Sequence, residues 1–232
     1  MPVAKGSTID PARTRAAVID AATPLLYDRG IDGVGVAELC RRLGISKETL
    51  YRHFGTKEGL VHAVLEARSD RVITWLTGAA TAAGPDPADR LTAVFAALGE
   101  WYLEPTFRGC AMINAATQHY DPGIRAVTAR HLDRCLALFT DIATRAGSDA
   151  PDALGRRLLL VMEGATAVAA HLGPDQVGEQ ASAAIAVNPR RRPDFTDRHI
   201  DPTGVRGFPL APSAGLRPPG APRPMRKTRG GA

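Results

Sequence analysis

The sequence has few cysteines, no long apolar run and no pattern typical of strands. Its three cysteines show no CxxC or other paired spacing, which excludes a disulfide framework and a conventional zinc ribbon. No stretch approaches about 18 consecutive apolar residues, and the chain does not open with a charged start followed by an apolar run. We therefore expect neither a membrane span nor a secretory signal, and we predict a reducing cytoplasm as the location.

Net positive charge is absent from most of the chain. The whole sequence has 29 Lys plus Arg and 24 Asp plus Glu, a formal net charge of +5, but residues 1–187 hold 19 basic and 21 acidic residues. Residues 188–232 hold the excess, together with nine Pro and six Gly. Such a segment cannot bury enough apolar surface to offset the entropy lost on ordering, so we predict a disordered Pro/Arg/Gly-rich tail there. Overall basicity is not evidence for nucleic-acid binding.

What the sequence does contain is a succession of helical patterns that predicts an all-α fold. Asp10-Pro11, Asp86-Pro87 and Asp121-Pro122 each combine a capping carboxylate with a proline suited to the first helical position. Residues 122–146 have an apolar stripe of period 3.6. Beyond two short helices described next, helices are predicted over 10–29, from about 57 to a break at 79–85, and over 86–103, 110–119, 122–146, 151–172 and 174–187.

The most informative stretch is a short helix, a tight turn and a second short helix. The helices are predicted over Val36–Leu43 and Lys47–Phe54, with Gly44 at a left-handed turn position and Ser46 placed to cap the second helix. This is the helix-turn-helix pattern, and its second helix leaves polar side chains free to meet base edges in the major groove. A solvated helical hairpin without function is the competing interpretation of the pattern alone.

The wider context resembles the N-terminal DNA-binding domain of the TetR/AcrR family of transcriptional regulators. The resemblance covers about 50 residues and rests on Arg29-Gly30-Ile31, Gly44-Ile45-Ser46, Thr49-Leu50-Tyr51, His53-Phe54 and Lys57-Glu58-Gly59-Leu60. It implies a helix-turn-helix domain at residues 1–56 and a helical ligand-binding and dimerisation domain at 57–187. It also implies that DNA is contacted by Lys47, Thr49, Tyr51, His53 and Lys57, the last through phosphate.

Two positions depart from the family pattern. The family usually has Ser or Thr ahead of Val36, where it caps the first helix of the motif and often bonds phosphate, but Val34 and Gly35 stand here. Glycine can still cap through its backbone conformation. Pro24 lies inside the first predicted helix, where it is expected to kink or loosen the last turns.

The resemblance also implies partners. A member of this family is expected to be a homodimer that binds a palindromic operator in double-stranded DNA, represses transcription, and is released by a small-molecule effector. The apolar stripe of Pro151–Leu172 that begins at Leu154 and Leu158 is long enough to line a partner helix. Candidate effector-binding residues are Trp101, Met112, Asn114, His119 and Glu163, for which ordinary core packing is the competing interpretation.

Other chemistries find little support in the sequence. No metalloprotease motif, phosphate loop or nucleophile elbow is present, so we predict that the protein is not an enzyme and uses no cofactor or metal. His131 and Cys135 share one helical face, which is more typical of a core imidazole beside a buried thiol than of a metal site. Two alternatives stay open: a small-molecule carrier or enzyme with a vestigial DNA module, and a regulator switched through Cys110 or Cys135.

Overall fold

The computed structural model describes residues 10–173 and Val177, and these form eight helices and no strand. The predicted all-α fold is thereby confirmed for the described residues, whereas the predicted helix at 174–187 and the predicted tail at 188–232 lie outside them, apart from Val177. The helices are α1 (Pro11–Arg29), α2 (Val36–Leu43), α3 (Lys47–Phe54), α4 (Lys57–Ala82), α5 (Pro87–Tyr102), α6 (Ala111–Gln118), α7 (Pro122–Arg145) and α8 (Pro151–Leu172).

Capping carboxylates set the starts of three helices. The side chains of Asp10, Asp86 and Asp121 accept hydrogen bonds from backbone N–H groups in the first turns of α1, α5 and α7. A proline follows each aspartate at the first helical position, where its missing N–H costs nothing. The Asp-Pro signals in the sequence are therefore confirmed as helix starts.

One helix differs from the sequence-based expectation, and α1 agrees with it. α4 continues to Ala82, so the small residues from Ala79 onward do not break it, because alanine is the strongest helix former. α1 remains a helix on both sides of Pro24 and ends at Arg29.

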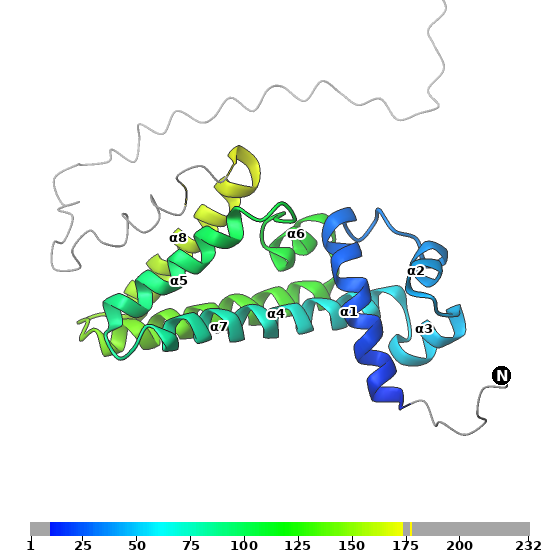
Figure 1. Cartoon of the computed structure of the whole chain (residues 1–232), viewed down its shortest axis with the longest axis horizontal. Helices are drawn as coiled ribbons and strands as arrows, with labels where there is room; N and C mark the ends of the chain where they lie inside the picture. Colours follow the sequence, from blue (N-terminus) through cyan, green and yellow to red (C-terminus); the bar gives the residue numbers. More distant parts are fainter. Residues whose placement is uncertain (1–9, 174–176, 178–232) are drawn as a thin grey trace, which may run out of the picture. The chain divides into compact units, whose positions relative to one another are not determined.

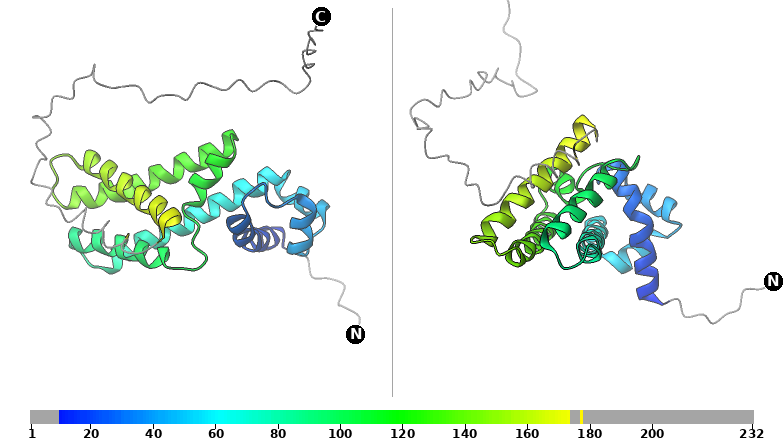
Figure 2. Two further views of the ribbon diagram at one scale, coloured as in Figure 1. Left: turned by 90° about the horizontal axis from the view of Figure 1, so that it is seen from above. Right: turned by 60° about the vertical axis from the view of Figure 1, so that its left-hand side comes forward.

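The buried side chains form two cores that α4 and α7 connect (Figure 1). The first core joins α1, α2 and α3 to the first half of α4, to α6 and to the start of α7. The second joins the rest of α4 and α7 to α5 and α8. Met112 and Ala115 place α6 in the first core, so a helix from the predicted ligand-binding domain shares a core with the helix-turn-helix. Figure 2 shows α6 between α1 and the α5–α8 end.

The inward face of α8 corrects one expectation. Leu158, Met162 and Ala165 of the stripe proposed to line a partner helix are buried in the second core of their own chain, against α5 and α7. The large apolar side chains that α8 leaves exposed are Leu160, Val168 and Leu172. None of the helices described is long and apolar enough to cross a membrane.

Candidate nucleic-acid interface

The helix-turn-helix is built by local signals that the sequence contains. Gly44 ends α2 with φ +65°, and its N–H donates to Cys40 O. Ser46 begins α3 by accepting a hydrogen bond from Thr49 N at 3.0 Å. Leu39 and Leu50 are fully buried where α2 and α3 meet the rest of the first core, which fixes the angle between the two helices.

The outward face of α3 is polar and accessible. Lys47 and Arg52 are exposed, and Tyr51 has 46% of its surface exposed. Thr49 and His53 are half-buried, and Thr49 Oγ1 lies 2.9 Å from Ser46 Oγ. These groups form a set of donors and acceptors along α3, and Lys47 and Thr49 lie in its N-terminal half, the part of such a helix that reaches base edges.

Lys57 has a structural contact as well as its predicted one. Its Nζ donates to Ile31 O at 2.6 Å and so holds the loop after α1 against the start of α4. An ammonium group has three N–H donors, so this bond leaves two for phosphate oxygens. Thr56 caps the same helix end by accepting from Gly59 N.

The start of α2 lacks the side-chain cap that the family pattern usually supplies. Gly35 is the N-cap residue, and no side chain accepts from the first turn. The first turn is held through Glu38 instead, which pairs with Arg29 at 2.6 Å and with Arg42 at 3.0 Å and so joins α2 to the end of α1.

A pocket of about 330 Å³ lies between α1, α4 and α6, inside the first core. Arg68 is its most unusual lining residue, because its guanidinium stacks 3.8 Å from the Tyr27 ring and has no carboxylate partner among the described residues. Burial lowers the pKa of Arg68. The other polar residues that line the pocket include Tyr27, Arg108, Asn114 and Gln118.

Of the five predicted effector-binding residues, the structure places only Asn114 in this pocket's wall. Asn114 Nδ2 donates to Arg108 O at 2.7 Å. Trp101 packs edge-on against Trp75 and Phe107 in the second core.

The remaining three are buried or partly buried at separate places. Met112 is buried in the first core. His119 Nε2 lies 3.1 Å from Asp32 Oδ2 in an orientation that makes no hydrogen bond. Glu163 faces a group of thiol and imidazole side chains between α6, α7 and α8.

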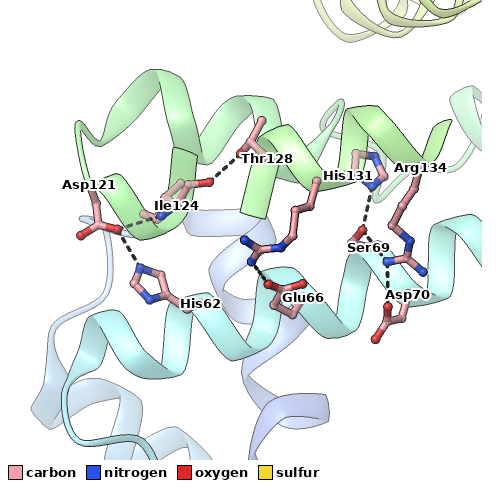
Figure 3. A network of polar contacts seen from close by, with 10 residues as sticks. His62, Glu66, Ser69, Asp70, Asp121, Ile124, Thr128, His131 and Arg134 are labelled. Atoms are coloured by element: carbon pink, nitrogen blue, oxygen red, sulfur yellow. Dashed lines mark hydrogen bonds and ion pairs between the residues drawn. The ribbon is translucent and has the colours of Figure 1, made fainter. Parts of the chain in front are cut away.

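That interior group brings together Cys110, His131 and Glu163, whose ligand-type atoms all lie within 4.8 Å of one another. His131 Nδ1 lies 2.9 Å from Ser69 Oγ, and Figure 3 shows Ser69 between His131 and Arg134. His131 Nε2 lies 3.7 Å from Cys135 Sγ. The expectation of no metal site considered the His131–Cys135 pair alone and missed Cys110 and Glu163 as its neighbours.

Burial sets the protonation of this interior group. It raises the pKa of Glu163 to about 7 and, with the Glu163 carboxyl adding to the effect, those of Cys110 and Cys135 to about 12. Burial, followed by the charges of Arg134 and Arg68, lowers the pKa of His131 to about 4. Both thiols and the imidazole are therefore uncharged at neutral pH when no cation is bound.

Arg68 and Glu163 each leave a signal in the sequence, because each is a charged residue inside an apolar helical stripe. Arg68 interrupts the apolar stripe of α4 between Leu65 and Val72, at a spacing where a charged residue must be buried or paired. Glu163 interrupts α8 in the same way between Leu159 and Ala170.

Known proteins show the same fold and the same N-terminal motif. Residues 18–64 match the family model described as bacterial regulatory proteins, tetR family. The transcriptional activator FasR of Mycolicibacterium smegmatis is 26% identical over 141 residues, 61% of this chain and 64% of FasR. The class D tetracycline repressor protein of Escherichia coli is 46% identical over 50 residues, 22% of this chain and 23% of that protein.

One solved structure extends the likeness along both halves. SCO4454, a TetR-family transcriptional regulator from Streptomyces coelicolor, is 28% identical, with a TM-score of 0.66 over 75% of this chain and 93% of that one. The curated relatives above are matched over less than two thirds of their own lengths. Fold and motif together define the class: over the described residues this is an all-helical protein with a helix-turn-helix in its N-terminal part. Residues 18–64 thus match the TetR family of bacterial regulatory proteins, and the described residues share the fold of a TetR-family regulator.

Proposed function

We propose that the protein is a dimeric, ligand-responsive repressor that binds a palindromic operator in double-stranded DNA. The observation that carries this proposal is the accessible polar face of α3, which a tight Gly44 turn presents beside α2. Lys47, Thr49, Tyr51 and His53 are assigned to the DNA-facing side, and Lys57 is assigned to phosphate. A regulator of this kind acts in the cytoplasm and needs no catalytic group.

The outward face of α8 supports dimer formation. Leu160 is 73% exposed and Leu172 is 85% exposed, and Val168 lies between them on the same face. Gly164 completes this row of residues four apart, and a Cβ built there meets no atom within 4 Å. An apolar row with a glycine at its centre allows two helices to approach closely. A two-fold dimer would place the two α3 helices about 34–36 Å apart, one turn of DNA.

The pocket between α1, α4 and α6 supports an effector site. It contains a guanidinium, Arg68, that no carboxylate of the described residues neutralises, so a small, largely apolar effector with an anionic or acceptor group fits it best. Tyr27 connects this pocket to α6, since its hydroxyl donates to Gly109 O and accepts from Arg108 N, both at 2.8 Å. A ligand that displaces Tyr27 would shift α1 and therefore the helix-turn-helix.

The test is fluorescence anisotropy of the full chain with promoter DNA from beside its own coding region, against random DNA of equal length. We expect specific binding at least about 10³-fold tighter than binding to random DNA at physiological salt. Equal affinity for the promoter DNA and the random DNA would refute the proposal.

A second candidate, a small-molecule carrier with a vestigial DNA module, is favoured by the missing side-chain cap at Gly35. It predicts a ligand that binds tightly while leaving DNA affinity unchanged. The alternative thiol switch is disfavoured, because burial raises the pKa of Cys110 and of Cys135 to about 12 and keeps both thiols protonated and weakly nucleophilic.

A further inference from the structure

The group formed by Cys110, His131 and Glu163 has the composition of a metal site. The three residues come from three different elements: the N-cap of α6, the middle of α7 and the middle of α8. They are 21 and 32 positions apart in the sequence, and the fold brings their ligand-type atoms to within 4.8 Å of one another. A thiol, an imidazole and a carboxyl are the three side-chain types that bind Zn²⁺ in proteins.

The protein itself provides no partner for the acidic member. Glu163 makes neither a hydrogen bond nor an ion pair with any residue that the structure describes, although it is partly buried. Burying a carboxyl group without a partner is costly, so its retention needs a reason. A cation held between Glu163 and Cys110 supplies one, since a thiolate and a carboxylate together neutralise a divalent ion.

His131 is held in an orientation suited to coordination. Its ring is 2% exposed, and Nδ1 lies 2.9 Å from Ser69 Oγ, which also accepts from Arg134 Nη1 at 3.2 Å (Figure 3). A hydroxyl oxygen has two lone pairs, so it can accept from Arg134 and from Nδ1–H together. Nε2 is then the nitrogen without a proton, which can coordinate a metal in place of its 3.7 Å contact with Cys135 Sγ, and the Ser69 bond fixes the ring as outer partners of metal-binding histidines do.

We propose that Cys110 Sγ, His131 Nε2 and a Glu163 carboxylate oxygen bind one Zn²⁺ ion per chain, with water in the fourth position. Zinc bonds of about 2.3 Å to sulfur and about 2.0–2.2 Å to nitrogen and oxygen require the three ligand atoms to approach by roughly 1 Å. Zn²⁺ suits this mixture of soft and hard ligands better than Mg²⁺ or Ca²⁺, which prefer oxygen alone.

The site also has a direct connection to the DNA-binding helices. Cys110 directly follows the segment Arg108–Gly109, to which the Tyr27 hydroxyl of α1 is bonded twice. Drawing Cys110 toward His131 and Glu163 would pull this segment, and through Tyr27 it would pull α1. We therefore expect zinc to weaken operator binding, a consequence that rests on the proposed function, whereas zinc binding itself does not.

The binding test uses the full chain purified with a chelator and a thiol reductant, then loaded with Zn²⁺ and desalted. We expect about one zinc per chain by mass spectrometry, and Co²⁺ loading should give a thiolate-to-cobalt absorption band near the ultraviolet. Cys110→Ser should abolish the band, and Glu163→Gln should weaken zinc affinity at least about tenfold. Cys40→Ser is the matched control, because Cys40 is a buried cysteine outside the group and should leave both readouts unchanged.

Ser69→Ala keeps all three ligands and removes only the partner of His131 Nδ1. It should weaken zinc affinity about tenfold while leaving the Co²⁺ band in place. Circular dichroism melting of each variant separates loss of the site from loss of the fold. The assignment would be overturned if the folded parent chain retained less than a tenth of a zinc ion, or if a Cys110→Ser variant kept the cobalt band.

The regulatory consequence is measured separately by operator anisotropy with and without Zn²⁺. We expect an affinity loss of at least fivefold with zinc, and Tyr27→Phe should reduce that loss without changing zinc stoichiometry. Zinc binding in a chain that shows no specific DNA binding would refute the proposed function and leave the site standing. Specific DNA binding in a chain that takes up no zinc would refute the site alone.

Discussion

Lys57 illustrates how one side chain combines a structural bond with a proposed functional contact. Its Nζ is bonded to Ile31 O, which keeps the ammonium beside the N-terminal end of α4 rather than free in solvent. A fixed ammonium loses less conformational freedom when it meets a phosphate than a mobile one does. The residue is therefore suited to setting the position of the protein on DNA rather than to reading its sequence.

We expect Lys57→Ala to weaken DNA binding by a similar factor on every sequence and to reduce the slope of log affinity against log salt by about one. Anisotropy titrations at several salt concentrations measure both quantities. Lys57→Arg retains the charge and should retain the slope. A loss confined to the operator, with an unchanged salt slope, would contradict the phosphate role.

Thr49 should behave differently, because its side chain lies on the face assigned to base edges. Thr49→Ala should alter the preference at one or two operator positions, by about 1–3 kcal/mol where a hydrogen bond or methyl contact to a base is lost. Binding to a library of single-base operator variants measures this. A uniform loss over the library would assign Thr49 to the backbone instead.

Asp121 links acid stability to the contact between α4 and α7. Its carboxylate accepts from Ile124 N and lies 2.7 Å from His62 Nε2, and these two contacts, in that order, lower the pKa of Asp121 below its usual value. A carboxyl with a lowered folded-state pKa stabilises the protein above its unfolded pKa of about 4, and this contribution disappears as the pH falls through the folded value.

Asp121→Asn should therefore lower the melting temperature most at neutral pH, and the difference from the parent should shrink below about pH 4. Thermal melts by circular dichroism between pH 3 and pH 7 measure this. Asp133→Asn, on the exposed side of the same helix, is the control and should show no such trend. A difference that stays constant over this range would remove the carboxylate charge from the explanation.

At the scale of the elements, the turn between α2 and α3 depends on one backbone conformation. Gly44 has φ +65° and open space around the position where a Cβ would stand. Gly78, inside α4, has the same open space and an ordinary helical backbone. The same substitution at these two positions thus separates the cost of conformation from that of crowding.

Gly44→Ala should destabilise the protein by about 1 kcal/mol, because an L-residue is strained in the left-handed region. Gly78→Ala should stabilise it by about 0.5–1 kcal/mol, because alanine loses less backbone entropy in a helix. Urea unfolding measures both. Equal signs for the two variants would show that φ at Gly44 is not what sets the turn.

At the scale of the whole molecule, α8 has an inward face in the second core and an outward face with exposed apolar side chains. Leu160→Glu should convert the proposed dimer into a monomer and lower operator affinity at least tenfold, since each half-site would then be bound alone. Sedimentation equilibrium and anisotropy measure the two effects. Leu103→Glu is the matched control, because Leu103 is equally apolar and 66% exposed but lies after α5.

The elements were largely predictable from the sequence because helix caps are local. α2, α3 and α8 begin and end at the predicted residues, since Gly44, Ser46 and Pro151 act within a single turn. The interior group was not predictable, because it depends on where three helices cross. The prediction that the apolar stripe of α8 lines a partner helix was wrong for a related reason. Periodicity identifies an apolar face but does not tell whether that face packs against its own chain or a second one.

The position of α6 has a consequence for cooperativity. Met112 and Ala115 lie in the same core as Leu39 and Leu50, so the helix-turn-helix is not closed by residues 1–56. Moving α6 would take Met112 and Ala115 out of the core that also stabilises α2 and α3. We therefore expect α6 and the helix-turn-helix to unfold together in hydrogen exchange. Ligand-driven movement of α6 and the stability of α2 and α3 are then coupled. Any ligand that releases DNA by moving α6 must also lower the protection of the α2 and α3 amides from hydrogen exchange.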